Sequence, residues 1–192
     1  MDYLAKASAF AKQYGLSTHL DGARIFNAAV KLEIPAVDIA RYFDSVSFCI
    51  SKGLGAPVGS LLCGRREFIE EARRWRKVLG GGMRQAGILA AAGLYALDHN
   101  IQRLVEDHAH AETLTQRLSD LPETDMLPYS GVTNMVFLRI RKGNTKDLTG
   151  FLKNQGILIT DRNPLRLVTH LDVDRNAVDS LIEGFKQYFS SC

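Results

Sequence analysis

One lysine stands where an apolar stretch of the chain meets a glycine-rich turn. Residues 45–51 form an apolar run with two β-branched residues, which predicts a buried strand, and Lys52 follows it. Because an ammonium group at such a place is partly desolvated, its pKa tends to fall, and the neutral amine can then attack a carbonyl carbon. A lysine that points from the strand end into water is the alternative interpretation of this stretch.

A carboxylate ends an earlier predicted strand. Residues 16–20 read as a strand, Asp21 and Gly22 close it, and Arg24 stands at the start of the next predicted helix. Asp before Gly is also a common turn pair. A buried acid at such a strand end could keep the ring nitrogen of pyridoxal phosphate protonated by charge pairing. Together with the lysine and a glycine-rich loop before a helix, this acid predicts a pyridoxal phosphate pocket.

A run of three glycines precedes another predicted helix. Gly80, Gly81 and Gly82 could offer bare N–H groups and a positive helix end to an anion, and Arg84 could face the same anion. A flexible hinge between two helices is an equally good interpretation. The order of residues 52–55 is not that of a P-loop, which needs its glycines before the lysine.

Arg166 lies in an otherwise apolar predicted strand. A buried arginine needs a carboxylate partner, either from the protein or from a substrate, because an unpaired buried charge is costly. The pattern alone slightly favours the alternative, an arginine on an edge strand that points into water. His108 and His110 lie on different faces of one predicted helix, so no metal site is predicted.

The predicted elements place these residues relative to one another. Helices and strands alternate in the first part of the chain, which predicts a parallel sheet whose ligands gather at the carboxyl ends of the strands. Asp21 and Lys52 would both stand at that edge. The predicted helices cover residues 1–14, 25–30, 37–43, 67–78, 83–99, 101–118, 146–154 and 173–189, and the predicted strands cover residues 16–20, 45–51, 58–63, 134–140, 156–160 and 165–170. The residues expected to form the buried face of helix 67–78 are Phe68, Ala72, Trp75 and Leu79.

Composition excludes several classes of protein. The 192 residues, 46% of them hydrophobic, suffice for one good core or for a medium domain with a smaller partner. The net charge of +3 is spread along the chain, so no nucleic-acid surface is expected, and the basic residues 65–77 are interrupted by glutamates. Cys49 and Cys63 are expected in the core. No membrane span or targeting segment is visible, so a cytoplasmic location is expected.

Four segments of the sequence resemble the low-specificity L-threonine aldolases, which have the aspartate-aminotransferase-like (type I) fold of pyridoxal phosphate enzymes. The resemblance rests on the order and spacing of residues 19–26, 51–60, 79–85 and 165–170. It implies an α/β fold with a mainly parallel sheet, in which residues 1–85 are the remainder of the large cofactor-binding domain. Residues 86–110 would then be connecting helices, and residues 111–192 a small C-terminal α/β domain.

The same resemblance implies a role for each candidate residue. Lys52 would be the covalent attachment point of the cofactor, and Asp21 would pair with its ring nitrogen. Arg24 would hold oxygens of the cofactor or the substrate, and Arg166 would bind the substrate carboxylate. Arg84 would reach the phosphate region across a subunit interface, with Lys77 near that interface, because the family resembles dimers of dimers.

The implied reaction is cleavage of threonine or allo-threonine to glycine and acetaldehyde. The sequence departs from the family because it begins where family members are already well into the large domain. The part without a counterpart normally supplies a phosphate loop, a histidine stacked on the cofactor and several strands. An open sheet edge and impaired activity are therefore expected. The alternatives are an inactive fragment that associates with full-length subunits, or a related β-eliminating lyase or transaminase.

Overall fold

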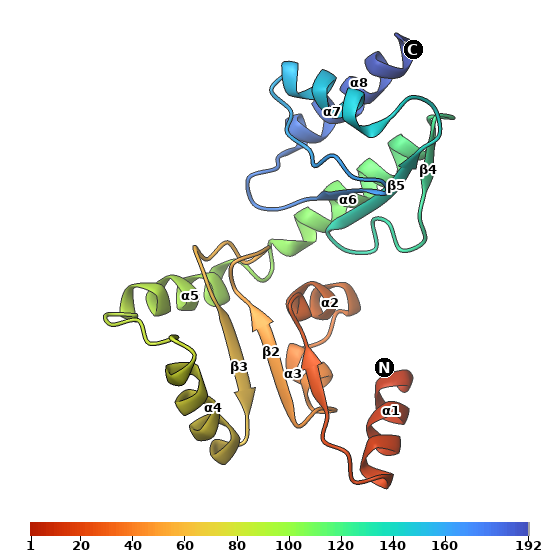
Figure 1. The fold of residues 1–192 in the computed structure, drawn as a ribbon. Helices are drawn as coiled ribbons and strands as arrows, with labels where there is room; N and C mark the ends of the chain where they lie inside the picture. Colours follow the sequence, from red (N-terminus) through yellow and green to blue (C-terminus); the bar gives the residue numbers. More distant parts are fainter. Residues whose placement is uncertain (192) are drawn as a thin grey trace. The chain divides into compact units, whose positions relative to one another are not determined.

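The structure is a computed structural model, and it describes residues 1–191. The chain divides into two compact units, a first unit of residues 1–102 and a second unit of residues 103–192. Both contain helices and a three-stranded sheet, which confirms the α/β class (Figure 1). Among the described residues, no helix combines the length and the apolar character needed to cross a membrane.

The sheet of the first unit is mixed. Its strands are β1 (His19–Asp21), β2 (Ser45–Cys49) and β3 (Ser60–Gly64), in the order β1-β2-β3. β1 and β2 are parallel, as predicted, whereas β2 and β3 are antiparallel. The segment of residues 50–59 between β2 and β3 is too short for the crossover that a parallel connection needs, so the chain must turn back.

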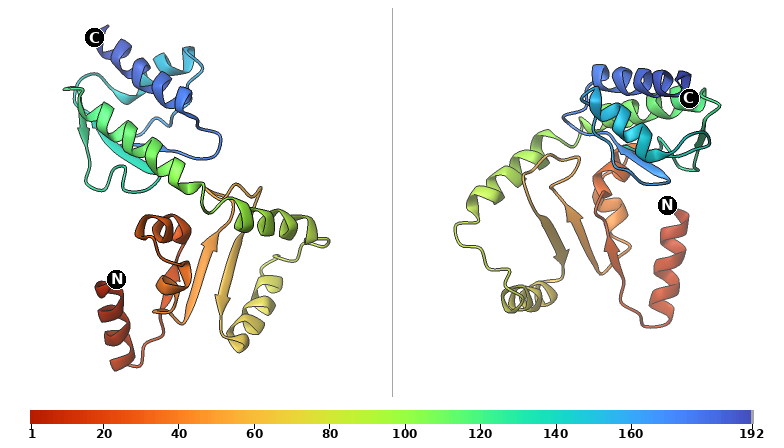
Figure 2. Two further views of the ribbon diagram at one scale, coloured as in Figure 1. Left: turned by 180° about the vertical axis from the view of Figure 1, so that it is seen from behind. Right: turned by 45° about the horizontal axis from the view of Figure 1, so that its top comes forward.

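The first unit also contains five helices: α1 (Asp2–Gln13), α2 (Ile25–Leu32), α3 (Ala36–Ala40), α4 (Arg66–Val78) and α5 (Gly87–His99). The helices α2 and α3 cover one face of the sheet, where Val46 of β2 packs with Ile25, Ala29 and Ile39 (Figures 1 and 2). Side chains of a strand alternate between its two faces. The opposite face therefore carries the more polar set His19, Asp21, Ser45, Ser47, Cys49 and Ser60.

The edge of the sheet at β3 is open. All five residues of β3 are exposed, which confirms the expectation of an open edge. The predicted core position of Cys63 is wrong, because this exposed residue lies on an outer strand, and Cys49 is only half-buried. The predicted buried face of α4 is also wrong. No residue of this helix is buried, and Trp75 is 56% exposed.

The connection between β2 and β3 is held from two sides. Its ends close on each other, since Ile50 N–H donates to the Gly59 carbonyl at 3.1 Å. Asn100, just after α5, donates its side-chain amide to the Leu54 carbonyl at 2.7 Å. Gly93 of α5 lies against Ile50, and a Cβ at this glycine would come within 3.0 Å of the isoleucine methyl. Helix α5 therefore fixes the loop that carries Lys52.

The second unit packs three helices against an antiparallel sheet. Its elements are α6 (Leu104–Ser119), β4 (Thr124–Met126), β5 (Met135–Ile140), α7 (Thr145–Asn154), β6 (Leu165–Val168) and α8 (Arg175–Ser190), with the strand order β4-β5-β6. The core joins Leu118 of α6, Val136 of β5 and Phe185 of α8. The predicted strand 156–160 is wrong. Gly156 and Ile157 close the end of α7 through hydrogen bonds to the Lys153 and Leu152 carbonyls.

Asp44 ties the start of β2 to the residue before β1. Its carboxylate accepts the Thr18 N–H at 2.8 Å and the Thr18 hydroxyl at 3.1 Å, and its own N–H donates to Thr18. These bonds lower the pKa of Asp44, with the backbone bond as the largest cause. A carboxyl pKa that is lower in the folded state stabilises the fold above the unfolded-state pKa, and this stabilisation is lost as the pH falls through the folded-state pKa.

We expect Asp44→Ala to lower the urea midpoint of unfolding at neutral pH, because both Thr18 donors lose their acceptor. The difference from the natural chain should narrow as the pH falls below about 4. Unfolding followed by circular dichroism at several pH values measures it. Asp44→Asn is the matched control, since its oxygen still accepts but does not titrate. A difference for Asp44→Ala that is equal at neutral and acid pH would contradict the linkage.

We expect Asn100→Ala to loosen the Lys52 loop, because the buried Leu54 carbonyl loses its partner at a cost of about 1–3 kcal/mol. Trypsin cuts after lysine, so cleavage after Lys52 should become faster relative to cleavage after Lys31. Timed digestion with mass spectrometry measures both rates. Gln102→Ala, at an exposed position nearby, is the control and should leave the ratio unchanged. An unchanged ratio in Asn100→Ala would show that this hydrogen bond does not hold the loop.

Candidate functional site

Asp21 and Lys52 stand at the same edge of the first unit's sheet. β1 ends at Asp21, and β2, which runs parallel to it, ends three residues before Lys52. The turn after Asp21 is fixed by its own hydrogen bonds: Asp21 Oδ1 accepts the Ala23 N–H at 3.2 Å, and Gly22 N–H donates to the Ser47 carbonyl at 2.7 Å. A Cβ at Gly22 would lie 3.0 Å from that carbonyl oxygen, so glycine permits this close approach.

Cys49 is the last residue of β2, three residues before Lys52 in the sequence. Ser60 of β3 donates its hydroxyl to the Cys49 thiol, with 3.2 Å between oxygen and sulfur. The charges of Lys52 and Asp21 both act on this thiol. The pKa of Cys49 is lowered, first by the Ser60 hydrogen bond and then by Lys52, against the raising effects of burial and Asp21. The charges of Asp21 and Lys52, the two predicted site residues, thus have opposite effects on the pKa of the same thiol.

Both charged side chains are exposed. The predicted burial of Asp21 and the predicted desolvation of Lys52 are therefore wrong for residues 1–191. The site borders the sheet face that α2 and α3 do not cover, and β1 and β3 are the outer strands, so water reaches it from the face and from the edge. The alternative interpretation, a lysine at a strand end in water, describes this structure.

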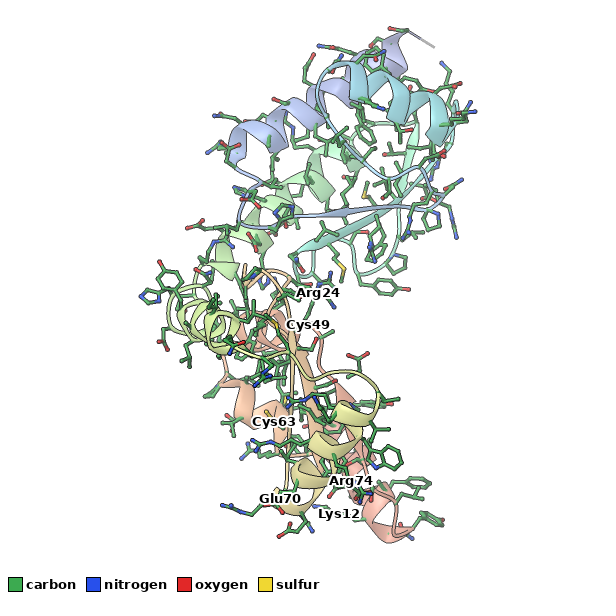
Figure 3. The ribbon with its side chains drawn as sticks, turned by 60° about the vertical axis from the view of Figure 1, so that its left-hand side comes forward. Lys12, Arg24, Cys49, Cys63, Glu70 and Arg74 are labelled. Carbon is green, nitrogen blue, oxygen red and sulfur yellow. The ribbon has the colours of Figure 1, made fainter. Side chains whose placement is uncertain are left out.

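Arg24 stands next to this edge, at the residue that precedes α2, and it is half-buried. Figure 3 shows Arg24 and Cys49 at one end of the sheet, away from Glu70 and Arg74 of α4. The polar face continues down the strands. His19 places its two ring nitrogens 2.9 Å from the Ser45 hydroxyl and 3.3 Å from the Ser47 hydroxyl.

The glycine run caps α4 and does not lead directly into α5. Gly80 has a φ of +90° and donates to the Lys77 carbonyl, Gly81 donates to the Arg76 carbonyl at 2.8 Å, and Gly82 donates to the Gly80 carbonyl. This is the bonding of a Schellman cap. The predicted offer of bare N–H groups to an anion is wrong, because these N–H groups are used within the chain. Arg84 follows in an exposed segment, and α5 begins only at Gly87.

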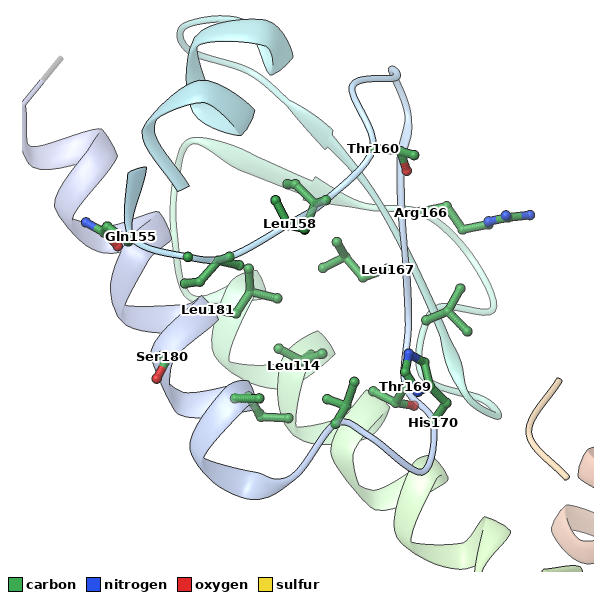
Figure 4. A pocket seen from close by; sticks show the side chains of 17 residues that line it. Leu114, Gln155, Leu158, Thr160, Arg166, Leu167, Thr169, His170, Ser180 and Leu181 are labelled. Atoms are coloured by element: carbon green, nitrogen blue, oxygen red, sulfur yellow. The ribbon is translucent and has the colours of Figure 1, made fainter. Parts of the chain in front are cut away.

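Arg166 belongs to the second unit, where β6 is an outer strand. It is exposed, while its neighbours Leu165 and Leu167 are buried. A cavity of about 760 Å³ lies beside β6, and Arg166 itself, Leu114 and Leu181 are among the residues that line it. The guanidinium of Arg166 extends away from those leucines (Figure 4). The structure thus matches the edge-strand alternative, and binding of a carboxylate by Arg166 stays a prediction.

Sequence reasoning missed Cys49 and Ser60 as site residues. A signal for them exists in the alternation along β2, where Ser45, Ser47 and Cys49 share the face of Asp21 while Val46 and Phe48 point to the core. Within the described part of the chain, no group of three or more His, Cys, Asp or Glu side chains could hold a metal ion.

Comparison with known proteins identifies relatives along almost the whole chain. The low specificity L-threonine aldolase of Escherichia coli K12 is 44% identical over 189 residues, which cover 98% of this chain and 56% of that protein. The low-specificity L-threonine aldolase 1 of Arabidopsis thaliana is 38% identical over 192 residues, covering 97% of this chain and 54% of that protein. The chain thus spans about half the length of the curated relatives it matches.

Solved structures share the fold. A protein from Exiguobacterium sp. 255-15 superposes with a TM-score of 0.81 at 25% identity, over 96% of this chain and 56% of that one. Leishmania major threonine aldolase superposes with a TM-score of 0.75 at 21% identity, over 96% of this chain and 55% of that one. The family model described as beta-eliminating lyase matches residues 1–141, which is more than half of the sequence. The chain therefore belongs to the beta-eliminating lyase family.

Proposed function

We propose that this chain carries the part of a threonine aldolase active site that contains the cofactor-binding lysine. The reaction is the cleavage of L-threonine or L-allo-threonine to glycine and acetaldehyde with pyridoxal phosphate. The observation that carries the proposal is that Asp21 and Lys52 follow the carboxyl ends of two paired parallel strands at one sheet edge. The identity of 44% to the E. coli aldolase over 98% of the chain supports the same reaction class.

The residues present fit one end of the cofactor better than the other. An accessible amine on Lys52 and a carboxylate on Asp21 are the two groups that the aldehyde and the ring nitrogen of pyridoxal phosphate require. The phosphate end has less support, because the Gly80–Gly82 N–H groups bond within the chain. Arg84 is the candidate that remains there from the sequence.

Each proposed residue has a task that its chemistry allows. Lys52 would hold the cofactor covalently, and Asp21 would keep a proton on the ring nitrogen by charge pairing. Arg24, next to Asp21 in the same turn, would bind oxygens, and Arg166 would bind the substrate carboxylate. The bound cofactor supplies an electron sink for the carbanion that forms when the Cα–Cβ bond breaks.

The open site supports impaired activity of the isolated chain. Water reaches both Lys52 and Asp21, so charge interactions between them and a ligand are screened. An inactive fragment that associates with full-length subunits is therefore retained as an alternative. A β-eliminating lyase is favoured by the family model over residues 1–141, and it would release ammonia and a keto acid instead of glycine and acetaldehyde.

We expect pyridoxal phosphate to form a borohydride-reducible adduct on Lys52 at lower concentrations than on other exposed lysines, because Asp21 adds a second contact. Reduction followed by peptide mapping measures the adduct at each lysine, and Lys31 and Lys153 serve as internal references. Asp21→Asn should remove the preference for Lys52. Equal labelling of all lysines would refute the cofactor site, whereas rapid glycine formation from threonine would refute only the impairment.

We further propose that the chain forms homo-oligomers, as expected for a dimer of dimers. The support is the apolar surface formed by α4 and the residue after it, where Phe68 is 43%, Trp75 56% and Leu79 84% exposed. Sedimentation of the natural chain should show a species larger than the monomer. Trp75→Glu should shift it toward the monomer, while Glu70→Gln on the same helix should not. A monomer at all concentrations would overturn this proposal.

A further inference from the structure

A cavity of about 450 Å³ lies in the first unit, at the end of the sheet opposite to the proposed cofactor site. Its lining includes Thr18 and Asp44, which directly precede β1 and β2. Because these strands are parallel, the cavity lies at their amino ends, whereas the proposed cofactor residues follow their carboxyl ends. Figure 3 shows Lys12, another lining residue, at the other end of the sheet from Arg24 and Cys49. The reaction proposed above assigns this cavity no task.

The charge that lines the cavity is mostly positive. Three cations come from separate segments: Lys12 from the last turn of α1, Arg41 from the residue after α3, and Arg65 from the residue before α4. The carboxylate of Asp44 also lines the cavity, but it already accepts two hydrogen bonds. Arg41 pairs with Asp38 at 3.2 Å, whereas Lys12 and Arg65 form no ion pair within residues 1–191. Two cations are therefore available to an anionic ligand.

Two further features of the lining suit an anion. Ser8 of α1 is only 8% exposed and lines the cavity, and its hydroxyl has no hydrogen-bond partner in the part of the chain that the structure describes. Gly64 and Arg65, which also line the cavity, lead into α4, and no side chain caps the first turn of that helix. The first N–H groups of a helix carry a partial positive charge and lack partners within the helix. Cations, a hydroxyl donor and a helix start are the groups that bind phosphate in proteins.

We propose that this cavity is a phosphate-binding site, separate from the proposed cofactor site, with inorganic phosphate or a small phosphate monoester as its ligand. Arg65 binds phosphate oxygens through its guanidinium, Lys12 adds a second positive charge, and the Ser8 hydroxyl donates a hydrogen bond. A volume of about 450 Å³ is within the range of small-molecule sites, so it also accommodates the organic part of a small ester. The inference does not depend on the reaction at Lys52.

Isothermal titration calorimetry with inorganic phosphate and with glycerol phosphate tests the proposal without any cofactor. Sodium chloride keeps the ionic strength constant, because salt screens the exposed cations. Both probes carry the phosphate dianion, so each is expected to bind at this site. Tighter binding of glycerol phosphate would assign the cavity to phosphate esters, and tighter binding of inorganic phosphate would assign it to the free ion. Absence of binding by both probes would overturn the proposal.

Variants of the lining locate the bound phosphate. Arg65→Gln and Lys12→Gln should each weaken binding roughly tenfold, and Ser8→Ala roughly threefold. Two variants that remove a charge elsewhere should leave binding unchanged: Lys31→Gln on α2, and Arg84→Gln at the phosphate end of the proposed cofactor site. Urea unfolding of each variant confirms that it is folded.

Unchanged binding in Arg65→Gln or in Ser8→Ala, or loss of binding in Arg84→Gln, would overturn the proposal, because the phosphate would then bind outside this cavity. Failure of pyridoxal phosphate to label Lys52 would refute only the proposed function.

Discussion

The parallel pairing of β1 with β2 is the interaction on which the site depends. It sets Asp21 opposite Ser47 and ends both strands at one edge of the sheet. An acid and an amine separated by thirty residues of sequence therefore stand at the same edge. The hydrogen bond from Gly22 to the Ser47 carbonyl extends this pairing one residue past β1. A slip of the register by one residue would turn Asp21 to the apolar face and remove the site.

The loop that carries Lys52 needs a second support, because a strand end alone does not fix the residues beyond it. Helix α5 gives this support through the Asn100 amide and through the close contact of Gly93 with Ile50. Leu54 and Ala56 are buried while Lys52 is exposed, so the loop is anchored by its apolar residues and presents the amine outward. The loop is thus ordered while its charged group remains accessible.

Most elements of the fold could be predicted from periodicity because their packing lies within the chain. The segments around α2, β2, α7 and α8 bury one face in their own unit, so their patterns report their structure. The buried face predicted for α4 from the spacing of Phe68 and Trp75 was wrong for the same physical reason. Its apolar spacing reports a surface suited to burial, but no residue of α4 is buried within residues 1–191.

The strand predicted over residues 156–160 shows a different limit. Ile157 and Ile159 pack against the core of the second unit, as alternation suggests, but the backbone there closes α7 instead of pairing with a strand. Likewise, the glycine run has the composition of an anion loop and the bonds of a helix cap. In both cases composition constrains which surface is buried, whereas the partners of the backbone N–H groups decide what the segment can bind.

Cys49 shows why the site was only partly visible in the sequence. Read as one apolar run, residues 45–51 predict a strand buried on both faces, and a cysteine there is a small core residue. Read with period two, the same residues give one apolar and one polar face, and the polar face is shared with Asp21. The two interpretations differ in whether β2 has a solvated side. That depends on what covers the sheet, so it is a tertiary property that a single strand cannot encode.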